Sequence, residues 1–218
     1  MFDRIAARYD RLNRVLSFGT DIGWRRRAID RAGLAAGQTV LDLGAGTGDL
    51  AFAAADRGAR VLALDLSPGM LAVLGRRASA GQRALITPVV GTAEALPLPD
   101  ASVDRIVSGF TVRNVGDLPR TFAELRRVLR PGGRVVILEL SHPPNRAFGR
   151  LYSFYFARLA PHLAVLLGGD PAAYRYLPRS LGPFPGPDRL AALLRAAGFG
   201  RVAYERVTFG IAAIHTAE

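Results

Sequence analysis

The chain has 218 residues, of which 50% are hydrophobic and 22% are charged, a balance typical of a globular chain of about one domain. It has no cysteine, so a disulfide scaffold and a cysteine nucleophile are excluded, and three widely separated histidines predict no metal site. The formal charge is +11 and every basic residue is arginine. Because the arginines are spread along the chain, we favour compositional bias over an anionic partner and expect no nucleic acid.

The chain start, MFDRIAARYD, has no uncharged apolar core of the length found in signal peptides. No segment approaches the ~18 uninterrupted apolar residues that a membrane-spanning helix needs. These two features lead us to expect a cytoplasmic protein.

Residues 1–24 mix charged and aromatic residues without a clear period, and regular patterns begin after them. The patterns predict helices at 25–34, 49–56, 68–79 and 118–129, and strands at 38–43, 60–64, 85–90, 103–108 and 134–140. Ser67 is the expected N-cap of the third helix, with Pro68 in its first position. Helices that alternate with apolar strands predict an α/β fold, a mostly parallel sheet covered on both faces.

The alternation ends at Ser141, and residues 142–186 are rich in aromatic residues and proline. A last helix is predicted at 189–197, followed by strands at 201–207 and 211–216. The connection between these strands is too short for a crossover helix, so the final pair should be antiparallel.

The strongest motif is VLDLGAGTGD at residues 40–49, where a strand runs into a glycine-rich turn and then a helix. Such a turn brings a ligand close to the backbone and to the free N–H groups of the helix. A dinucleotide fingerprint is the alternative, but it requires glycine at the position of Asp49. An aspartate there would repel a pyrophosphate and suit a cationic ligand, which favours S-adenosylmethionine over NAD.

Two further loops follow predicted strands. Asp65 lies 21 residues after Gly44, where an acid can accept both ribose hydroxyls of an adenosine, a spacing that fits NAD equally well. The loop GTAEALPLPD begins at Gly91, and the backbone of Thr92 and Ala93 is placed to face an adenine. Together with the glycine turn, these loops indicate a nucleoside site at one edge of the sheet.

With VLRPGGRVVILELS, these motifs resemble those of class I methyltransferases. The segments FDRIAARYDRLNRVLSFGTDIGWRR, FTVRNVGDL, AYRYLPRSLGPFPG and VTFGIAAIHTA further resemble the ubiquinone/menaquinone biosynthesis C-methyltransferases, over nearly the whole chain. The resemblance implies a single Rossmann-like domain, 1–218, that uses S-adenosylmethionine. It implies methylation of a ring carbon of a polyprenylated quinol, either demethylmenaquinol, which we favour, or a methoxy-benzoquinol.

The resemblance also implies donor-binding residues. In the family, Asn or Asp often stands at the position of Thr92, and Ser at that of Gly109, so this chain should rely more on backbone contacts there. The expected donor-binding set is Asp42, Gly44, Gly46, Thr47, Asp65, Leu66, Thr92, Ala93 and Gly109.

Arg113 and Asn114 follow the fourth predicted strand, on the ligand side of the sheet. A charged arginine is no base, but it can lower the pKa of a phenol, stabilise the phenolate or orient a water that takes the proton. Asn114 could fix the hydroxyl. The alternative is structural, with Arg113 paired to Asp117 at the start of the next helix.

The family closes its N-terminal segment, here residues 1–24, over donor and ring. Tyr9 is therefore expected to touch the ring or the donor, and Asp10 to help accept a proton; a solvated helix start is the equal alternative. Trp24 is expected to be a packing anchor.

Residues 142–186 are expected to form a lid over the acceptor pocket. Their interleaved arginines and aromatics suit an element that takes a prenyl-tailed substrate from an anionic membrane surface, in transient peripheral contact. A packed helix at the sheet edge is the alternative, and a homodimer is compatible with the sequence. Other functions that we weighed are methylation of another small apolar acceptor, RNA methylation, and lipid binding without catalysis.

Overall fold

The computed structural model describes residues 17, 19–154, 158, 182 and 184–218. Within these residues one seven-stranded sheet has the order β3-β2-β1-β4-β5-β7-β6. All neighbouring strands are parallel except β7, which is antiparallel to both β5 and β6, as the short final connection predicts. The strands are β1 (Thr39–Leu43), β2 (Arg60–Asp65), β3 (Ile86–Val90), β4 (Val103–Gly109), β5 (Leu129–Leu140), β6 (Val202–Val207) and β7 (Ala212–Ala217).

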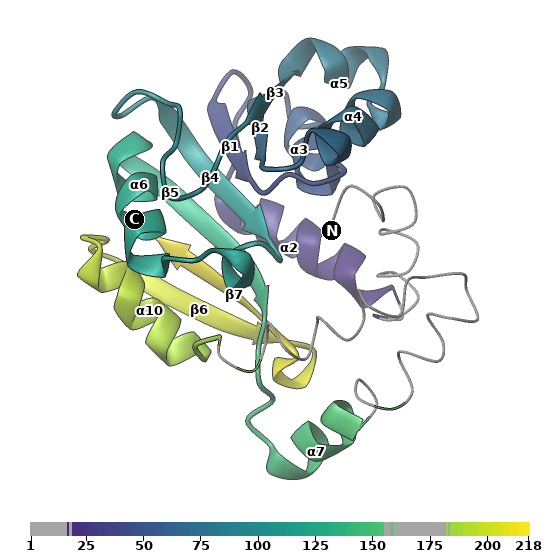
Figure 1. Cartoon of the computed structure of the whole chain (residues 1–218), viewed down its shortest axis with the longest axis vertical. Coiled ribbons are helices and arrows are strands. Elements are labelled where there is room, and N and C mark those ends of the chain that lie inside the picture. Colours follow the sequence, from purple (N-terminus) through teal and green to yellow (C-terminus); the bar gives the residue numbers. More distant parts are fainter. Residues whose placement is uncertain (1–16, 18, 155–157, 159–181, 183) are drawn as a thin grey trace.

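Helices cover both faces of the sheet, as predicted (Figure 1). One face carries α2 (Thr20–Ala32), α3 (Asp49–Ala55) and α4 (Pro68–Arg77), whose apolar side chains share one buried cluster. The other face carries α6 (Leu118–Val128) and α10 (Pro187–Ala196), which share a second cluster. These two cores fix the sheet between the helix layers and leave its carboxyl edge open for a site.

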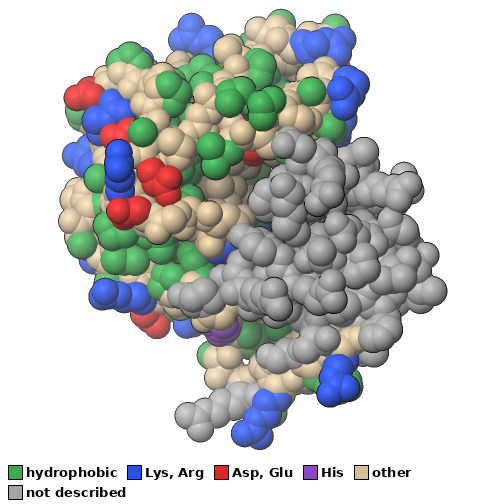
Figure 2. All heavy atoms as spheres, viewed as in Figure 1, with side chains coloured by type: hydrophobic (Ala, Val, Ile, Leu, Met, Phe, Trp, Pro, Cys, Tyr) green, Lys and Arg blue, Asp and Glu red, His purple; other side chains and the backbone are tan. Residues whose placement is uncertain are grey.

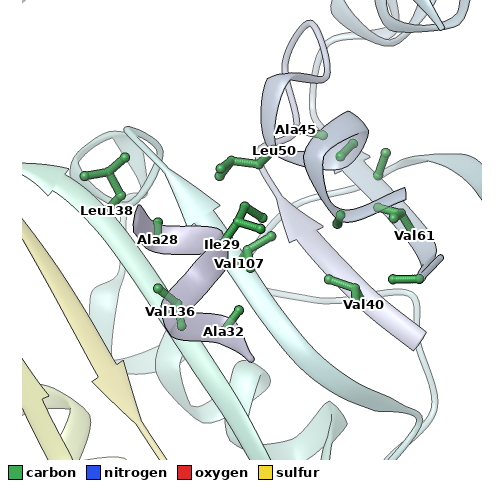
Figure 3. Close-up of a cluster of buried hydrophobic side chains, with 14 of the residues drawn as sticks. Ala28, Ile29, Ala32, Val40, Ala45, Leu50, Val61, Val107, Val136 and Leu138 are labelled. Atoms are coloured by element: carbon green, nitrogen blue, oxygen red, sulfur yellow. The ribbon is translucent and has the colours of Figure 1, made fainter. Parts of the chain in front are cut away.

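The first core is built from small and branched side chains. Ala28, Ile29 and Ala32 of α2 lie over Val107 of β4 and Val136 of β5 (Figure 3). All five side chains are almost fully buried. The short alanines let α2 lie close to the central strands, so its first turn reaches the carboxyl edge of the sheet.

Helix boundaries follow the predicted caps in part. The Ser67 hydroxyl accepts a 3.0 Å hydrogen bond from the Met70 N–H, which confirms the predicted cap of α4. That helix ends at Arg77, and a second short helix, α5 (Ala80–Leu85), follows it. The sequence analysis missed α5, which is started by a reciprocal capping box between Ser79 and Gln82.

Two predicted boundaries were wrong. Helix α2 begins at Thr20 rather than residue 25, so residues 20–24 belong to the body of the fold. Strand β5 begins at Leu129, because Pro131, Gly132 and Gly133 continue the strand instead of separating it from α6.

Of the expected lid, the described part includes α7 (Arg146–Phe154), which stands apart from the sheet layers (Figure 1). The greater part of 142–186 lies outside the described residues, as do Tyr9 and Asp10. In the described part of the chain, no helix is long and apolar enough to cross a membrane. The arginine side chains visible on one face are dispersed around its edge, in keeping with their spread along the sequence (Figure 2).

Candidate functional site

A cavity of about 410 Å³ opens at the carboxyl ends of the parallel strands. It lies where the strand order reverses between β1 and β4, the position at which open α/β sheets bind ligands. All nine predicted donor-binding residues line it. The cavity is lined by Arg25, Asp42–Thr47, Asp49, Leu50, Leu64–Leu66, Met70, Gly91–Glu94, Gly109–Thr111 and Asn114–Gly116.

The glycine turn forms the floor of the cavity. Gly44 has a φ of +70°, and a Cβ at this position would lie 2.2 Å from the Thr111 side chain. The Gly46 N–H donates a 2.8 Å hydrogen bond to the Asp65 carboxylate. The absence of a side chain at Gly44 therefore allows the turn to approach the loop after β4, and the Gly46 N–H ties the turn to the end of β2.

Asp42 is the unusual acid of the site. It is 1% exposed, and neither carboxylate oxygen has a hydrogen bond of normal geometry to the described residues. Burial, followed by the charge of Asp65, raises the pKa of Asp42 to about 7, and the Ala51 N–H and the Arg25 guanidinium offset this only in part. A buried carboxyl that faces a cavity without a partner is suited to bind a cation.

Asp49 plays a different part from the one that the sequence argument gave it. Its carboxylate lies 2.9 Å from the Arg77 guanidinium and 3.6 Å from that of Arg25. The charge of Asp49 is thus balanced by two arginines, and the acid free to meet a cationic ligand is Asp42.

Asp65 and Leu66 form the wall at the end of β2. The Asp65 carboxylate accepts hydrogen bonds from the backbone N–H groups of Gly46, at 2.8 Å, and Ser67, at 2.9 Å. These bonds fix the carboxylate, and its remaining lone pairs can accept hydroxyl donors. The side chain of Leu66 is 70% exposed beside it and offers an apolar surface at the cavity.

Thr92 and Ala93, which follow β3, and Gly109, at the end of β4, also line the cavity. The Thr92 hydroxyl donates to Glu94 at 2.9 Å, so this hydroxyl is already engaged and the backbone is left to contact a ligand. At Gly109, a Cβ would lie 2.9 Å from the Cδ1 atom of Leu50. A side chain at this position would therefore be too close to Leu50 unless Leu50 moved.

Arg113 lies behind the cavity wall rather than on it. Its guanidinium is 2.5 Å from the carboxylate of Glu139 in β5, and both side chains are buried. Its backbone N–H also donates to Glu139, at 3.2 Å. The expected alternative, a pair with Asp117, is wrong, because Asp117 instead caps α6 by accepting from the Arg120 N–H. Asn114 of the short helix η1 (Val112–Asn114) does line the cavity.

Several cavity residues were not singled out from the sequence. Arg25, Leu50, Met70, Phe110 and Thr111 line the site, and Glu94 bridges two of its loops. Thr111 and Glu94 lie inside motifs that were recognised, but their pairing with distant backbone leaves no sequence signal.

Trp24 is a packing residue, as expected. Its indole donates a 2.8 Å hydrogen bond to the Thr208 hydroxyl, and its ring lies 6.3 Å from that of Phe110. The Arg25 guanidinium lies 5.0 Å from the same Phe110 ring. The first turn of α2 thus supports the loop after β4, beside the cavity.

Comparison with known proteins shows what the chain is similar to. The sequence model of the ubiE/COQ5 methyltransferase family matches residues 1–218. The chain is 49% identical over 221 residues to a demethylmenaquinone methyltransferase of Thermus thermophilus, covering 100% of the chain and 99% of that protein. It is 44% identical to a ubiquinone/menaquinone biosynthesis C-methyltransferase of Geobacter sulfurreducens, covering 100% of the chain and 86% of that protein.

Solved structures agree with the fold. A SAM-dependent methyltransferase from Thermotoga maritima superposes with a TM-score of 0.70 at 20% identity, over 99% of this chain and 97% of that one. A SAM-dependent methyltransferase from Aquifex aeolicus gives a TM-score of 0.62 at 20% identity, over 88% of both chains. The predicted Rossmann-like class I methyltransferase fold is confirmed.

Proposed function

Because the chain belongs to the ubiE/COQ5 methyltransferase family, we propose that it transfers the methyl group of S-adenosylmethionine to a ring carbon of a polyprenylated quinol. Relatives named demethylmenaquinone methyltransferase support demethylmenaquinol as the acceptor. Relatives named for ubiquinone as well make a benzoquinol the second acceptor to test. The observation that supports the donor half is the buried Asp42 at the cavity, whose carboxylate has no hydrogen bond of normal geometry to the described residues.

The residues at the cavity fit S-adenosylmethionine, which supplies an electrophilic methyl group when bound. The volume of about 410 Å³ falls in the range of roughly 300–1,000 Å³ that small-molecule sites occupy. Asp42 is suited to the ammonium group, and the fixed carboxylate of Asp65 to the ribose hydroxyls. Leu66 and the Ala93 backbone offer the two sides of a slot for an adenine.

On the acceptor side, the chain must hold a ring carbon in line with the methyl group and favour loss of the phenolic proton. Asn114 lines the cavity and is our candidate for a hydrogen bond to the quinol hydroxyl. Arg113 is ion-paired behind it, so we assign to Arg113 the positioning of η1. Tyr9 and Asp10 stay proposals that rest on the resemblance alone.

We also propose that the lid segment takes its substrate from an anionic membrane surface. Phe154, at the end of α7, is 56% exposed, and Phe209 is 79% exposed and packs edge-on against Phe148 of α7. Arg150 and Arg158 are exposed along the same segment. Flotation with vesicles of anionic and of neutral lipid tests this: binding should require the anionic lipid and fall with salt.

The function is tested by methyl transfer from radiolabelled S-adenosylmethionine to demethylmenaquinol and to a methoxy-benzoquinol, each reduced and dispersed in detergent. We expect a ring-methylated naphthoquinol, identified by mass. The oxidised quinone is the matched control, because it has no phenolic proton to lose and should stay unmethylated. If the donor binds but no quinol is methylated, the proposed donor site stands and a quinol is excluded as the acceptor.

A further inference from the structure

The two loops that wall the cavity come from strands that are not neighbours. The donor-side loop, residues 91–100, follows β3, and the acceptor-side loop, residues 110–117, follows β4. In the sheet order, β2 and β1 lie between β3 and β4. At ~4.8 Å per strand, the two strands are about 14 Å apart, so backbone pairing within the sheet cannot hold their loops together.

One side chain bridges this gap. One carboxylate oxygen of Glu94 accepts the Thr92 hydroxyl at 2.9 Å. The other accepts the backbone N–H groups of Gly116, at 2.7 Å, and Asp117, at 3.1 Å. These bonds lower the pKa of Glu94, the Thr92 bond most of all, so the side chain is ionised and the hydrogen bonds are charge-assisted.

The bridge joins both binding functions of the cavity. Thr92 and Ala93 belong to the donor side, whereas Gly116 lies two residues beyond Asn114, our candidate for the quinol hydroxyl. From the other end of the acceptor-side loop, Glu139 fixes η1 through Arg113. The wall that carries Asn114 is thus anchored at its start by Glu139 and at its end by Glu94.

We propose that Glu94 is a positioning residue that couples the two loops, so that a ligand held at Thr92 and Ala93 also orders the wall bearing Asn114. Asn114 as an acceptor contact rests on the proposed function. The coupling itself requires only that the donor binds, so it can be tested whether or not a quinol is methylated.

The test is amide hydrogen exchange of the full chain with and without S-adenosylmethionine. In the wild type, the donor should slow exchange both at 91–100 and at 110–117. In Glu94→Ala, both acceptor oxygens are removed, so the slowing at 110–117 should be reduced while that near Asp65 remains. The effect of donor on 110–117 should fall by about 2- to 30-fold, the range of coupling changes seen for such substitutions.

Glu124→Ala is the matched control. Glu124 holds the same donor-side loop by accepting the Leu96 N–H at 2.7 Å, but its ion pair is with Arg127 of its own helix and not with the acceptor-side loop. This variant should keep the slowing at 110–117. Equal loss in Glu124→Ala, or full slowing in Glu94→Ala, would overturn the proposal.

Thr92→Val gives a second route should Glu94→Ala fold poorly, because it removes only the hydroxyl that Glu94 accepts. It leaves the bonds from Glu94 to Gly116 and Asp117 but releases Glu94 from the donor-binding residue, so it should weaken the coupling. With demethylmenaquinol as acceptor, both variants should lose kcat at saturating donor, whereas Glu124→Ala should not. Wild-type exchange behaviour at 110–117 in Thr92→Val would contradict the bridge.

Discussion

Replacement of Asp42 by asparagine should make the unliganded protein more stable and the donor complex weaker. The Asp42 carboxyl is buried, has no hydrogen bond of normal geometry to described residues, and lies at the cavity. Its ionised form therefore destabilises the empty protein and is favourable only when a cation lies beside it. Asparagine keeps the shape and removes the charge.

The size of the expected stability change follows from the pKa of Asp42. Burial and the charge of Asp65 raise the pKa of Asp42 from 3.8 to about 7. Because the folded pKa exceeds the unfolded one, the native state prefers the protonated acid, and stability falls as the pH rises from about 4 to about 7. At about 1.4 kcal/mol per pKa unit, the loss above pH 7 is at most about 4 kcal/mol.

Thermal unfolding at pH 5 and pH 8, with calorimetric titration of S-adenosylmethionine at pH 8, measures both effects. The stability gain of Asp42→Asn should be larger at pH 8, at roughly 2–4 °C per kcal/mol for a chain of this size. Loss of a charge-assisted hydrogen bond, about 1.5–3 kcal/mol, predicts donor binding weaker by roughly 10- to 150-fold.

Asp49→Asn is the control for these measurements. Asp49 lines the same cavity but is paired with Arg77 and Arg25, so its loss should lower stability and change donor affinity less. A variant Asp42→Asn that is less stable than the wild type at pH 8, with unchanged donor affinity, would refute the reasoning.

Three further variants test other parts of the site and fold. Asp65→Ala should weaken donor binding at least tenfold by calorimetry, and an unchanged affinity would mean that the ribose is held elsewhere. Arg113→Met should lower the free energy of unfolding by about 3–5 kcal/mol, because it leaves Glu139 without its ion-pair partner. The double variant Arg113→Met, Glu139→Leu should regain stability but not turnover. Full turnover in the double variant would mean that the pair does not position the site. Burial lowers the pKa of His215, so the contribution of this residue to stability should decrease as the pH falls below 6.5, and the unfolding midpoint of His215→Gln should change less than that of the wild type for this reason.

Much of the fold could be predicted from the sequence because its signals are local. The apolar runs at β1, β2 and β4 and the cap at Ser67 each require only neighbouring residues to be recognised. The same holds for the antiparallel β6 and β7, whose connection is too short for any other arrangement. The residues that line the predicted donor site lie at or just after strand ends, where they could be expected from the sequence, and their contact with the donor stays a prediction.

What could not be predicted depends on partners far away in the sequence. The pairing of Arg113 with Glu139 spans 26 residues, and the nearby Asp117 was the more obvious candidate from spacing alone. The arginine partners of Asp49 come from α2 and α4, so a charge that looked free in the sequence is neutralised in the fold. In this chain, the partner of a charged residue is decided by which elements the fold brings together, and a local sequence motif does not show it.

The distribution of charge at the cavity then separates two roles for its acids. Asp49, Glu94 and Glu139 are each satisfied by arginine or backbone donors, and each holds one part of the wall in place. Asp42 alone among these four has no hydrogen bond of normal geometry in the described part of the chain. An acid left unsatisfied in the empty protein lowers stability, so its presence is best explained by a cationic ligand that compensates it. The paired carboxylates hold the wall in place, and we propose that Asp42 supplies the charge that attracts the donor.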